Sequence, residues 1–407
     1  MNTLEINNLK KILLFSLINS SIFIAFQPGF FPRLLIAALM NTSGILLVIS
    51  FFKYKRKTID KVSYFNVLFT LLILWSLFTV FRSVSLNSVT MISLFGHYLM
   101  GWAWMSPLAV VFGFKIINWI LLFDFFITLL KVGSIVALGS YFYSTATIFG
   151  IIEWMAFFPI ILLTFNFQSK DNKNILIFSI FSYLMLSYFG SQRANIIFLM
   201  LFVSFFIIES FKEAKVSALK KFLTLFVMLI GLVIIAVQAS SFIADMSNNK
   251  ELMTDTRTFL FLEMFNDMSL SDTIIGRGAM GTYFSPYFYM IEVRDVVSDS
   301  STRSVNEVGY LQMILKGGYV MVGLYLLILV PAAYLGIFKS NNIIAKSCGY
   351  FILAYLILWC VSYYIVYSAE YLLLWMATGT CISKSARNVK NDAMLIKIKE
   401  KVQFVKL

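Results

Sequence analysis

Long apolar runs, separated by short polar and basic segments, recur along almost the whole chain. A helix needs about 20 apolar residues to cross roughly 30 Å of hydrocarbon, and most of the runs approach that length. They do not alternate between apolar and polar positions, as the strands of a membrane barrel do. The pattern therefore predicts an all-α, polytopic integral membrane protein with about 12 transmembrane helices. The expected spans are residues 12–27, 34–52, 64–82, 89–112, 116–138, 145–167, 174–190, 195–210, 222–242, 308–337, 346–368 and 370–383.

One long segment, residues 243–306, interrupts this pattern between the ninth and tenth spans. A loop of that length is usually either functional or disordered, and its aromatic stretches favour order. Residues 256–268 are expected to form a helix, with Thr254 or Asp255 as its N-cap. The predicted parts are an N-terminal bundle of about nine helices (1–242), the long loop with its short helices (243–306), C-terminal transmembrane helices (307–383) and a basic tail (384–407).

The basic residues predict the orientation of the spans, because Lys and Arg concentrate in cytoplasmic loops. With the N-terminus inside, the inner segments hold Lys10 and Lys11, the cluster at 53–57, Lys115 and the tail from Lys384. Both termini are therefore expected to be cytoplasmic, and the long loop external. The net charge of +13 then reflects this asymmetry and contact with anionic lipids. The basic loops are short and scattered, so nucleic-acid binding is not expected.

Arginine is distributed differently from lysine. Most arginines fall on the predicted outer side or at outer span ends, namely Arg33, Arg82, Arg193, Arg257, Arg277, Arg294 and Arg303. The guanidinium is a permanently charged planar fork that can bind phosphate or carboxylate through two parallel hydrogen bonds. Two interpretations follow: these arginines pair with the acids of the outer loop, or they form an outer site for a phosphorylated or polyanionic substrate. We favour the second.

Glu307 begins the tenth span and is the candidate for chemistry. The helix dipole alone favours a carboxylate at a helix start. A carboxylate at the mouth of an outer cavity could instead act as a general base toward a sugar hydroxyl. A single histidine, three scattered cysteines and the lack of a D-x-D motif give no expectation of a metal or cofactor. The G-x-G-x-x-G pattern at 276–281 lacks the strand and helix of a dinucleotide site, so we do not assign one.

Several short motifs between about 190 and 330 resemble those of the bacterial O-antigen polymerase and ligase superfamily, which includes capsular polysaccharide polymerases. They are residues 190–193, Arg257, 274–278 with Gly281 and Tyr283, 307–312, 316–318 and 323–324. Members of this superfamily join oligosaccharides carried on undecaprenyl pyrophosphate at the outer face of the plasma membrane. Its lipid A ligases usually have a His-Asn pair where this chain has Glu307 and Val308. The resemblance therefore favours a polymerase over a ligase.

The resemblance implies a metal-independent glycosyltransferase in a bacterial plasma membrane, with a role for each matching residue. Arg193 and Arg257, and less closely Arg277 and Arg303, would bind the pyrophosphate, and Glu307 would be the catalytic base. Weaker candidates for binding the glycan are Gly278, Tyr283 and Tyr310. The expected partners are the undecaprenyl-pyrophosphate-linked oligosaccharide and membrane lipids, with a chain-length regulator and a flippase as candidates.

Two alternatives stay open. One is an O-antigen ligase-type glycan transferase, which attaches finished glycans to another molecule. The other is a flippase or transporter of lipid-linked oligosaccharides, which also has about 12 spans. The transporter is less favoured because the chain has no long inner loop between the sixth and seventh spans and no clear internal repeat.

Overall fold

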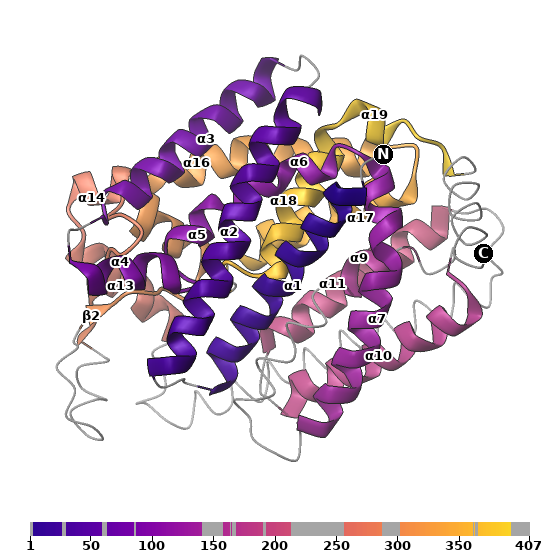
Figure 1. The fold of residues 1–407 in the computed structure, drawn as a ribbon, viewed down its shortest axis with the longest axis horizontal. Coiled ribbons are helices and arrows are strands. Elements are labelled where there is room, and N and C mark those ends of the chain that lie inside the picture. Colours follow the sequence, from indigo (N-terminus) through magenta and orange to yellow (C-terminus); the bar gives the residue numbers. More distant parts are fainter. Residues whose placement is uncertain are drawn as a thin grey trace.

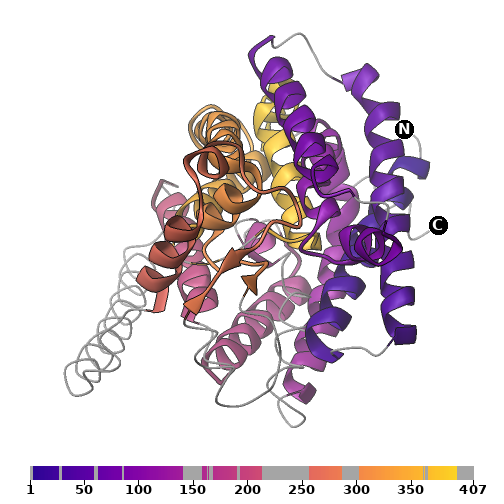
Figure 2. The same cartoon turned by 90° about the vertical axis from the view of Figure 1, so that its left-hand side faces the viewer.

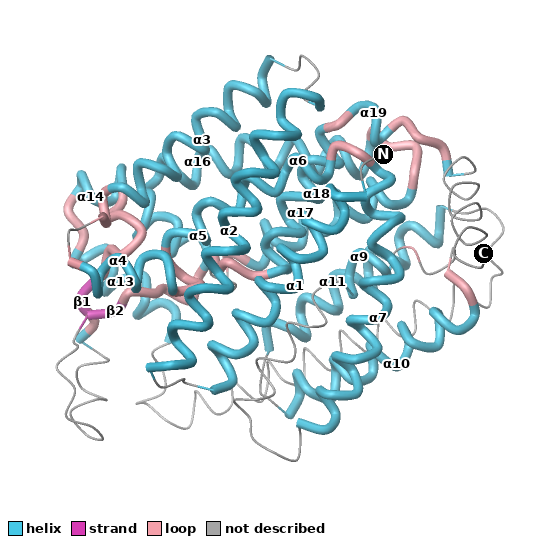
Figure 3. Tube along the Cα trace, in the orientation of Figure 1, coloured by secondary structure: helices cyan, strands magenta, loops and turns pink. Residues whose placement is uncertain are grey.

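The computed structural model describes residues 3–26, 30–58, 63–84, 87–140, 158–162, 164, 168–189, 193–212, 256–286, 302–360, 362 and 365–391. Figures 1 and 3 show that these residues form mostly helices, which pack side by side. The described strands are β1 (Tyr283–Phe284) and β2 (Thr302–Arg303), which pair antiparallel. The predicted all-α class is confirmed, with this short ribbon as its one addition among the described residues.

The longer helices follow the apolar runs closely. They are α1 (Thr3–Phe26), α2 (Phe30–Thr58), α3 (Ser63–Phe81), α7 (Ile116–Ser140), α10 (Lys170–Phe189), α11 (Arg193–Lys212), α16 (Gly309–Phe338), α17 (Ile343–Leu358) and α18 (Ala369–Ile382). The shorter ones are α4 (Ser88–Gly96), α5 (Gly101–Met105), the 3-10 turn η1 (Ser106–Ala109), α6 (Val110–Gly113), α9 (Phe158–Leu162), α13 (Thr256–Asp267), α14 (Leu270–Ile275) and α19 (Lys384–Arg387).

Four of the described helices are long and apolar enough to cross a membrane. They contain the stretches Leu34–Tyr54, Tyr64–Phe81, Ile116–Val136 and Gly309–Phe338. Large apolar side chains stay exposed on them, such as Phe52 at 67% and Leu74 at 58%, as expected for surfaces that meet lipid. The expected number of about 12 spans is not confirmed. Most of the predicted span 145–167 and all of 222–242 lie outside the described residues.

The predicted span 89–112 is not one helix. It divides into α4, a turn, and the sequence α5–η1–α6. In the turn, the Met100 N–H donates to the His97 carbonyl at 3.0 Å. Further on, Pro107 lies in the first turn of η1 and has no N–H to continue an α-helical ladder. The apolar pattern predicted one membrane span over this segment, but it did not predict where the helix is interrupted.

The centre of the bundle is formed by the α5–η1–α6 segment and α18. Every residue of α18 except Glu370 is buried, and so is nearly all of the segment facing it. Gly113 and Gly379 let the two backbones touch, because a Cβ on either would overlap a carbonyl oxygen of the other helix. A helix that is apolar on all sides belongs inside a protein or a membrane. These two are enclosed by other helices of the bundle.

The connections predicted to be cytoplasmic meet at one end of the bundle. Lys115 pairs with Glu5 at 3.3 Å, and the Arg387 guanidinium donates to the Lys339 carbonyl at 3.1 Å. The other end carries α13, α14 and the β-ribbon. In Figure 1 the two groups lie on opposite sides, and Figure 2 shows the ribbon and α13 facing the viewer. Among the described residues, the end with α19 therefore lies opposite the end with α13, α14 and the β-ribbon.

The compartment that each end faces can be tested with single cysteines in a background where the exposed Cys360 is replaced by serine. Leu270, at the long-loop end, is 78% exposed, and Ser385, at the other end, is also exposed. We expect Leu270→Cys to react with an impermeant thiol reagent in intact spheroplasts, and Ser385→Cys to react only after lysis. The reverse result would place the long loop in the cytoplasm and contradict an outer site.

Candidate functional site

The long loop is docked on a break in α16. At Gly318 the backbone has φ 70° and ψ −176°, which interrupts the helix. A break leaves carbonyl groups without their usual N–H partner four residues ahead, and buried carbonyls need one. The Leu315 and Lys316 carbonyls accept the N–H groups of Arg277 and Gly278 at 2.8 and 2.9 Å. Two of the short motifs, 276–278 and 316–318, are thus hydrogen-bonded to each other.

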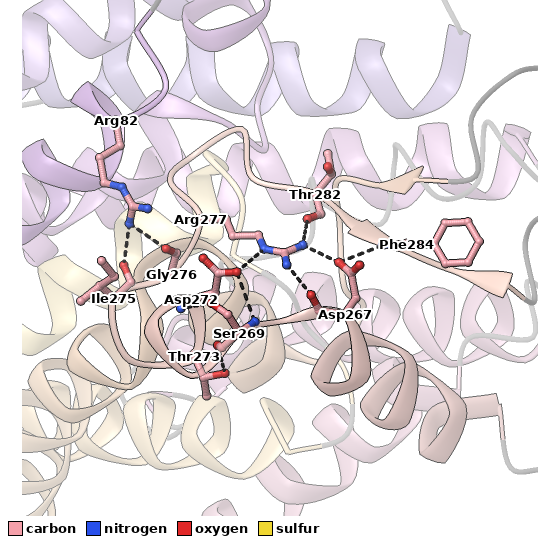
Figure 4. A network of polar contacts seen from close by, with 10 residues as sticks. All are labelled: Arg82, Asp267, Ser269, Asp272, Thr273, Ile275, Gly276, Arg277, Thr282 and Phe284. Atoms are coloured by element: carbon pink, nitrogen blue, oxygen red, sulfur yellow. Dashed lines mark hydrogen bonds and ion pairs between the residues drawn. The ribbon is translucent and has the colours of Figure 1, made fainter.

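The end of α3 holds the same loop from its other side. The Arg82 guanidinium donates to the Ile275 and Gly276 carbonyls at 3.1 and 2.6 Å, as Figure 4 shows. The Thr79 carbonyl accepts the Ala279 N–H at 2.9 Å. Arg82, one of the arginines predicted to lie on the outer side, therefore fastens the loop to the bundle through contacts with backbone carbonyls.

Glycine is required where the loop and the helix meet. Gly276 and Gly278 have φ values of 75° and 86°, a region that other residues rarely adopt. A Cβ on Gly276 would overlap the Lys316 carbonyl, and one on Gly278 would lie 2.8 Å from Ser83 Oγ. Gly278, a candidate glycan contact, is buried against α3. Its surroundings fit a packing role.

Arg277 is surrounded by acceptors of its own loop. Its Nε donates to Asp272 Oδ2 at 3.1 Å, and Nη1 bonds Asp267 Oδ2 and the Thr282 carbonyl. Nη2 donates to the Asp267 carbonyl at 2.5 Å. Figure 4 shows both carboxylates turned toward this guanidinium. Two carboxylates around one cation leave a net negative site, so this arrangement matches the interpretation in which an outer arginine pairs with loop acids.

The ionisation of this group supports the same assignment. Burial alone would raise the pKa of Asp272, but hydrogen bonds from Arg277 and Ser269 lower it overall. Burial would lower the pKa of Arg277, and its bonds to Asp267 and Asp272 raise it instead. Both groups are therefore charged at neutral pH, and Arg277 is held by its acids without any phosphate.

A second polar group lies beside the β-ribbon and is called the ribbon cluster below; its members are Glu263, Tyr283, Ser285, Arg303 and Glu307. Arg303 Nη2 and Glu307 Oε1 are 3.4 Å apart, with side chains 15% and 53% exposed. Ser285 Oγ donates to Glu263 Oε2 at 2.6 Å. Burial raises the pKa of Tyr283 to about 12, and the charges of Arg303, Glu263 and Glu307 all act on its hydroxyl. The cluster thus joins α13, both strands and the start of α16.

The ribbon cluster has the chemistry of a hydroxyl-binding site. Carboxylates, a guanidinium and hydroxyl groups can accept and donate the hydrogen bonds that a sugar requires. The Glu307 side chain is 53% exposed, so its carboxylate is open to an approaching molecule. Met264, Val308, Leu311 and Leu315 form a small buried core beneath it, so the acids stand on fixed elements.

The other predicted site residues are placed as follows. Tyr310 donates its hydroxyl to the Leu356 carbonyl at 3.0 Å and packs against Trp359, which is a contact between α16 and α17. Arg193 is the first residue of α11, and Arg257 the second of α13. The side chains of these two arginines lie outside the described residues. The structure therefore brings Tyr283, Arg303 and Glu307 together and places Gly278 and Arg277 in the adjoining loop.

Sequence reasoning found no role for Glu263, named Lys316 only as part of the motif 316–318, and did not predict helix α14. The helix had a visible signal, because Ser269 and Asp272 form a capping box: Ser269 Oγ accepts the Asp272 N–H at 3.1 Å. Glu263 lies on the predicted helix 256–268 next to the buried Met264. Only the tertiary fold shows that Glu263 meets the ribbon.

The described helices support a membrane protein, and the two polar groups lie together at the end that bears the long loop. The chain matches no protein-family profile, no curated protein and no solved structure.

Proposed function

We propose that this chain is a polysaccharide polymerase of the O-antigen or capsule type. It joins undecaprenyl-pyrophosphate-linked oligosaccharide repeat units at the outer face of a bacterial plasma membrane, without a metal. The observation that carries the proposal is the meeting of two motifs that are distant in sequence: the Gly278 N–H of the motif 274–278 bonds the Lys316 carbonyl of the motif 316–318. Glu307 of the motif 307–312 pairs with the neighbouring Arg303 at the same end of the bundle.

The proposed reaction needs an anion site and a proton acceptor. The pyrophosphate of the donor lipid binds Arg193 and Arg257, with Arg303 beside Glu307. A hydroxyl of a second lipid-linked unit attacks the anomeric carbon of the donor, so that a new C–O bond forms as the C–O bond to pyrophosphate breaks. Glu307 takes the hydroxyl proton. The arginines stabilise the charge that develops on the departing pyrophosphate.

Arg277 takes no part in the proposed reaction. Its guanidinium is bonded to Asp267 and Asp272, whose charges would repel an anion. Arg303 contacts Glu307 at 3.4 Å, a long and partly exposed ion pair. A partly exposed ion pair is worth little, so a bound pyrophosphate can compete with Glu307 for the Arg303 guanidinium.

The direct test is incubation of the purified protein with lipid-linked repeat units. We expect a ladder of longer glycans, each step one repeat unit larger, on the same lipid. A ligase would leave the repeat number unchanged and move the glycan to a different acceptor. A flippase in vesicles would change the side on which the glycan lies and not its length. A result of either kind would replace the polymerase proposal.

Arg193→Lys and Arg257→Lys should each lower the rate of polymerisation by at least about tenfold. Lysine keeps the charge but loses the planar fork that binds two phosphate oxygens at once. Arg387→Lys, at the opposite end of the bundle, is the matched control. The rate of glycan elongation at fixed donor concentration is the measurement. Normal elongation by both folded variants would mean that the two arginines are structural.

A further inference from the structure

Among the described residues, Lys316 is the most deeply buried cation. Its side chain is completely inaccessible, and Nζ donates to the Gly281 carbonyl at 2.8 Å. No ion pair links it to a carboxylate of the described residues. Burying an amino group is costly unless it is paired or hydrogen-bonded, so the bond to Gly281 offsets part of that cost.

Lys316 bonds the outer loop twice. Its carbonyl accepts the Gly278 N–H, and its ammonium reaches the Gly281 carbonyl at the other end of the same turn. The next carbonyl of the break, that of Gly317, accepts Trp75 Nε1 of α3 at 2.8 Å. The break in α16 therefore does more than bend a helix. It supplies acceptors and one buried donor to the turn 276–281, which contains no helix or strand.

The anchored turn is itself hydrogen-bonded to α13. The side chain of Arg277 leaves the anchored turn and bonds both the carboxylate and the carbonyl of Asp267, the last residue of α13. Figure 4 shows Arg82 on one side of the turn and Asp267 on the other. The same helix carries Glu263 of the ribbon cluster and begins next to Arg257. The path thus runs from Lys316 through the loop to α13.

We propose that Lys316 is a positioning residue for the outer site: its buried ammonium fixes the turn 276–281 on the break of α16, and through Arg277 it fixes α13. The residue touches no proposed substrate group. Its effect on activity rests on the proposed function, whereas its effect on the loop does not. Loosening this contact should therefore free the turn while the bundle stays folded.

The loop is tested with a buried cysteine. Ala279 is completely buried in the anchored turn, so Ala279→Cys in the Cys360→Ser background should react slowly with a small thiol reagent. Adding Lys316→Met removes the ammonium at similar length and should speed labelling at least about tenfold, because a buried hydrogen bond to a charged group is lost. Lys339→Met, an exposed lysine at the end of the same helix, is the matched control and should change nothing.

Equal labelling rates in the Lys316→Met and Lys339→Met proteins would overturn the proposal. If the cysteine itself perturbs the turn, hydrogen exchange of the peptide covering 276–281 gives the same comparison without it. Faster exchange in Lys316→Met, with an unchanged thermal midpoint, supports the anchor. Equal exchange rates contradict it.

Activity measurements distinguish a positioning role of Lys316 from an effect on protein stability alone. Lys316→Met should raise the KM for the lipid-linked donor at least about fivefold, because Arg257 and Glu263 are no longer held in place. A freed loop with unchanged KM and kcat would overturn the positioning role. If the wild-type protein makes no polymer at all, the proposed function fails, and the labelling rate alone decides whether Lys316 anchors the loop.

Discussion

Glu307→Gln should leave the protein folded and able to bind its donor, yet lower the rate of glycan transfer by roughly 100-fold or more. Glutamine keeps the size and hydrogen-bonding capacity of glutamate but cannot accept the hydroxyl proton. The side chain is 53% exposed, so the substitution disturbs no packing. Single-turnover transfer with saturating lipid-linked donor is the measurement that isolates the chemical step.

Two other accounts of Glu307 give different results. If the carboxylate only favours the start of α16, its loss costs at most about 0.3–1 kcal/mol and the polymer is unchanged. If its main partner is Arg303, 3.4 Å away, glutamine changes the affinity for the donor and not the saturated rate. An unchanged single-turnover rate would therefore remove Glu307 from the chemistry, whatever happens to binding.

Gly318→Ala should destabilise the protein by about 3 kcal/mol or more. The backbone there has φ 70°, and a Cβ would overlap the Ile274 carbonyl and crowd the Ile275 nitrogen. Relief would require α14 to move away from α16, which breaks the docking of the outer loop. We expect the thermal midpoint of the purified protein to fall by at least about 3 °C.

Gly323→Ala is the control, because it lies in the same helix and a Cβ at that position has nothing within 4 Å. Alanine is the better helix former by about 1 kcal/mol, so this variant should be as stable as the wild type or slightly more stable. Similar losses in both variants would show that α16 is sensitive throughout and that the break has no special role.

The helices were predictable because their signal is long and local. In a membrane, an apolar run of nearly 20 residues has to form a helix to satisfy its backbone hydrogen bonds. The ends of α3 and α16 therefore lie within about one residue of the predicted spans, and those of α2 within about six. The break at Gly318 was not predictable by the same route. From the sequence alone, two adjacent glycines in an apolar run indicate only a less stable helix. The break becomes evident from the loop residues that hydrogen-bond to its carbonyls.

The candidate site was predicted only in part. Charge sorting indicated that arginine gathers at one end, but it could not distinguish an arginine that binds phosphate from one that binds aspartate. In the structure, Arg277 pairs with Asp267 and Asp272, which are close to it in sequence, so it belongs to the second kind. Lys316 was overlooked as a functional residue because a lysine inside a span gives no hint of its acceptor. That acceptor, the Gly281 carbonyl, is brought near only by the tertiary fold.

The central position of α18 has a consequence for how the protein is assembled during synthesis. Gly379 of α18 contacts Gly113, and Thr380 of the same helix accepts the Trp119 indole N–H at 2.8 Å. Until residue 382 has left the ribosome, the α5–η1–α6 segment lacks the helix that covers it. The earlier helices must therefore enter the membrane before the helix that packs at their centre is available. Insertion factors that shield the buried Trp104 and Trp119 in that interval would protect the nascent protein until α18 packs against this segment.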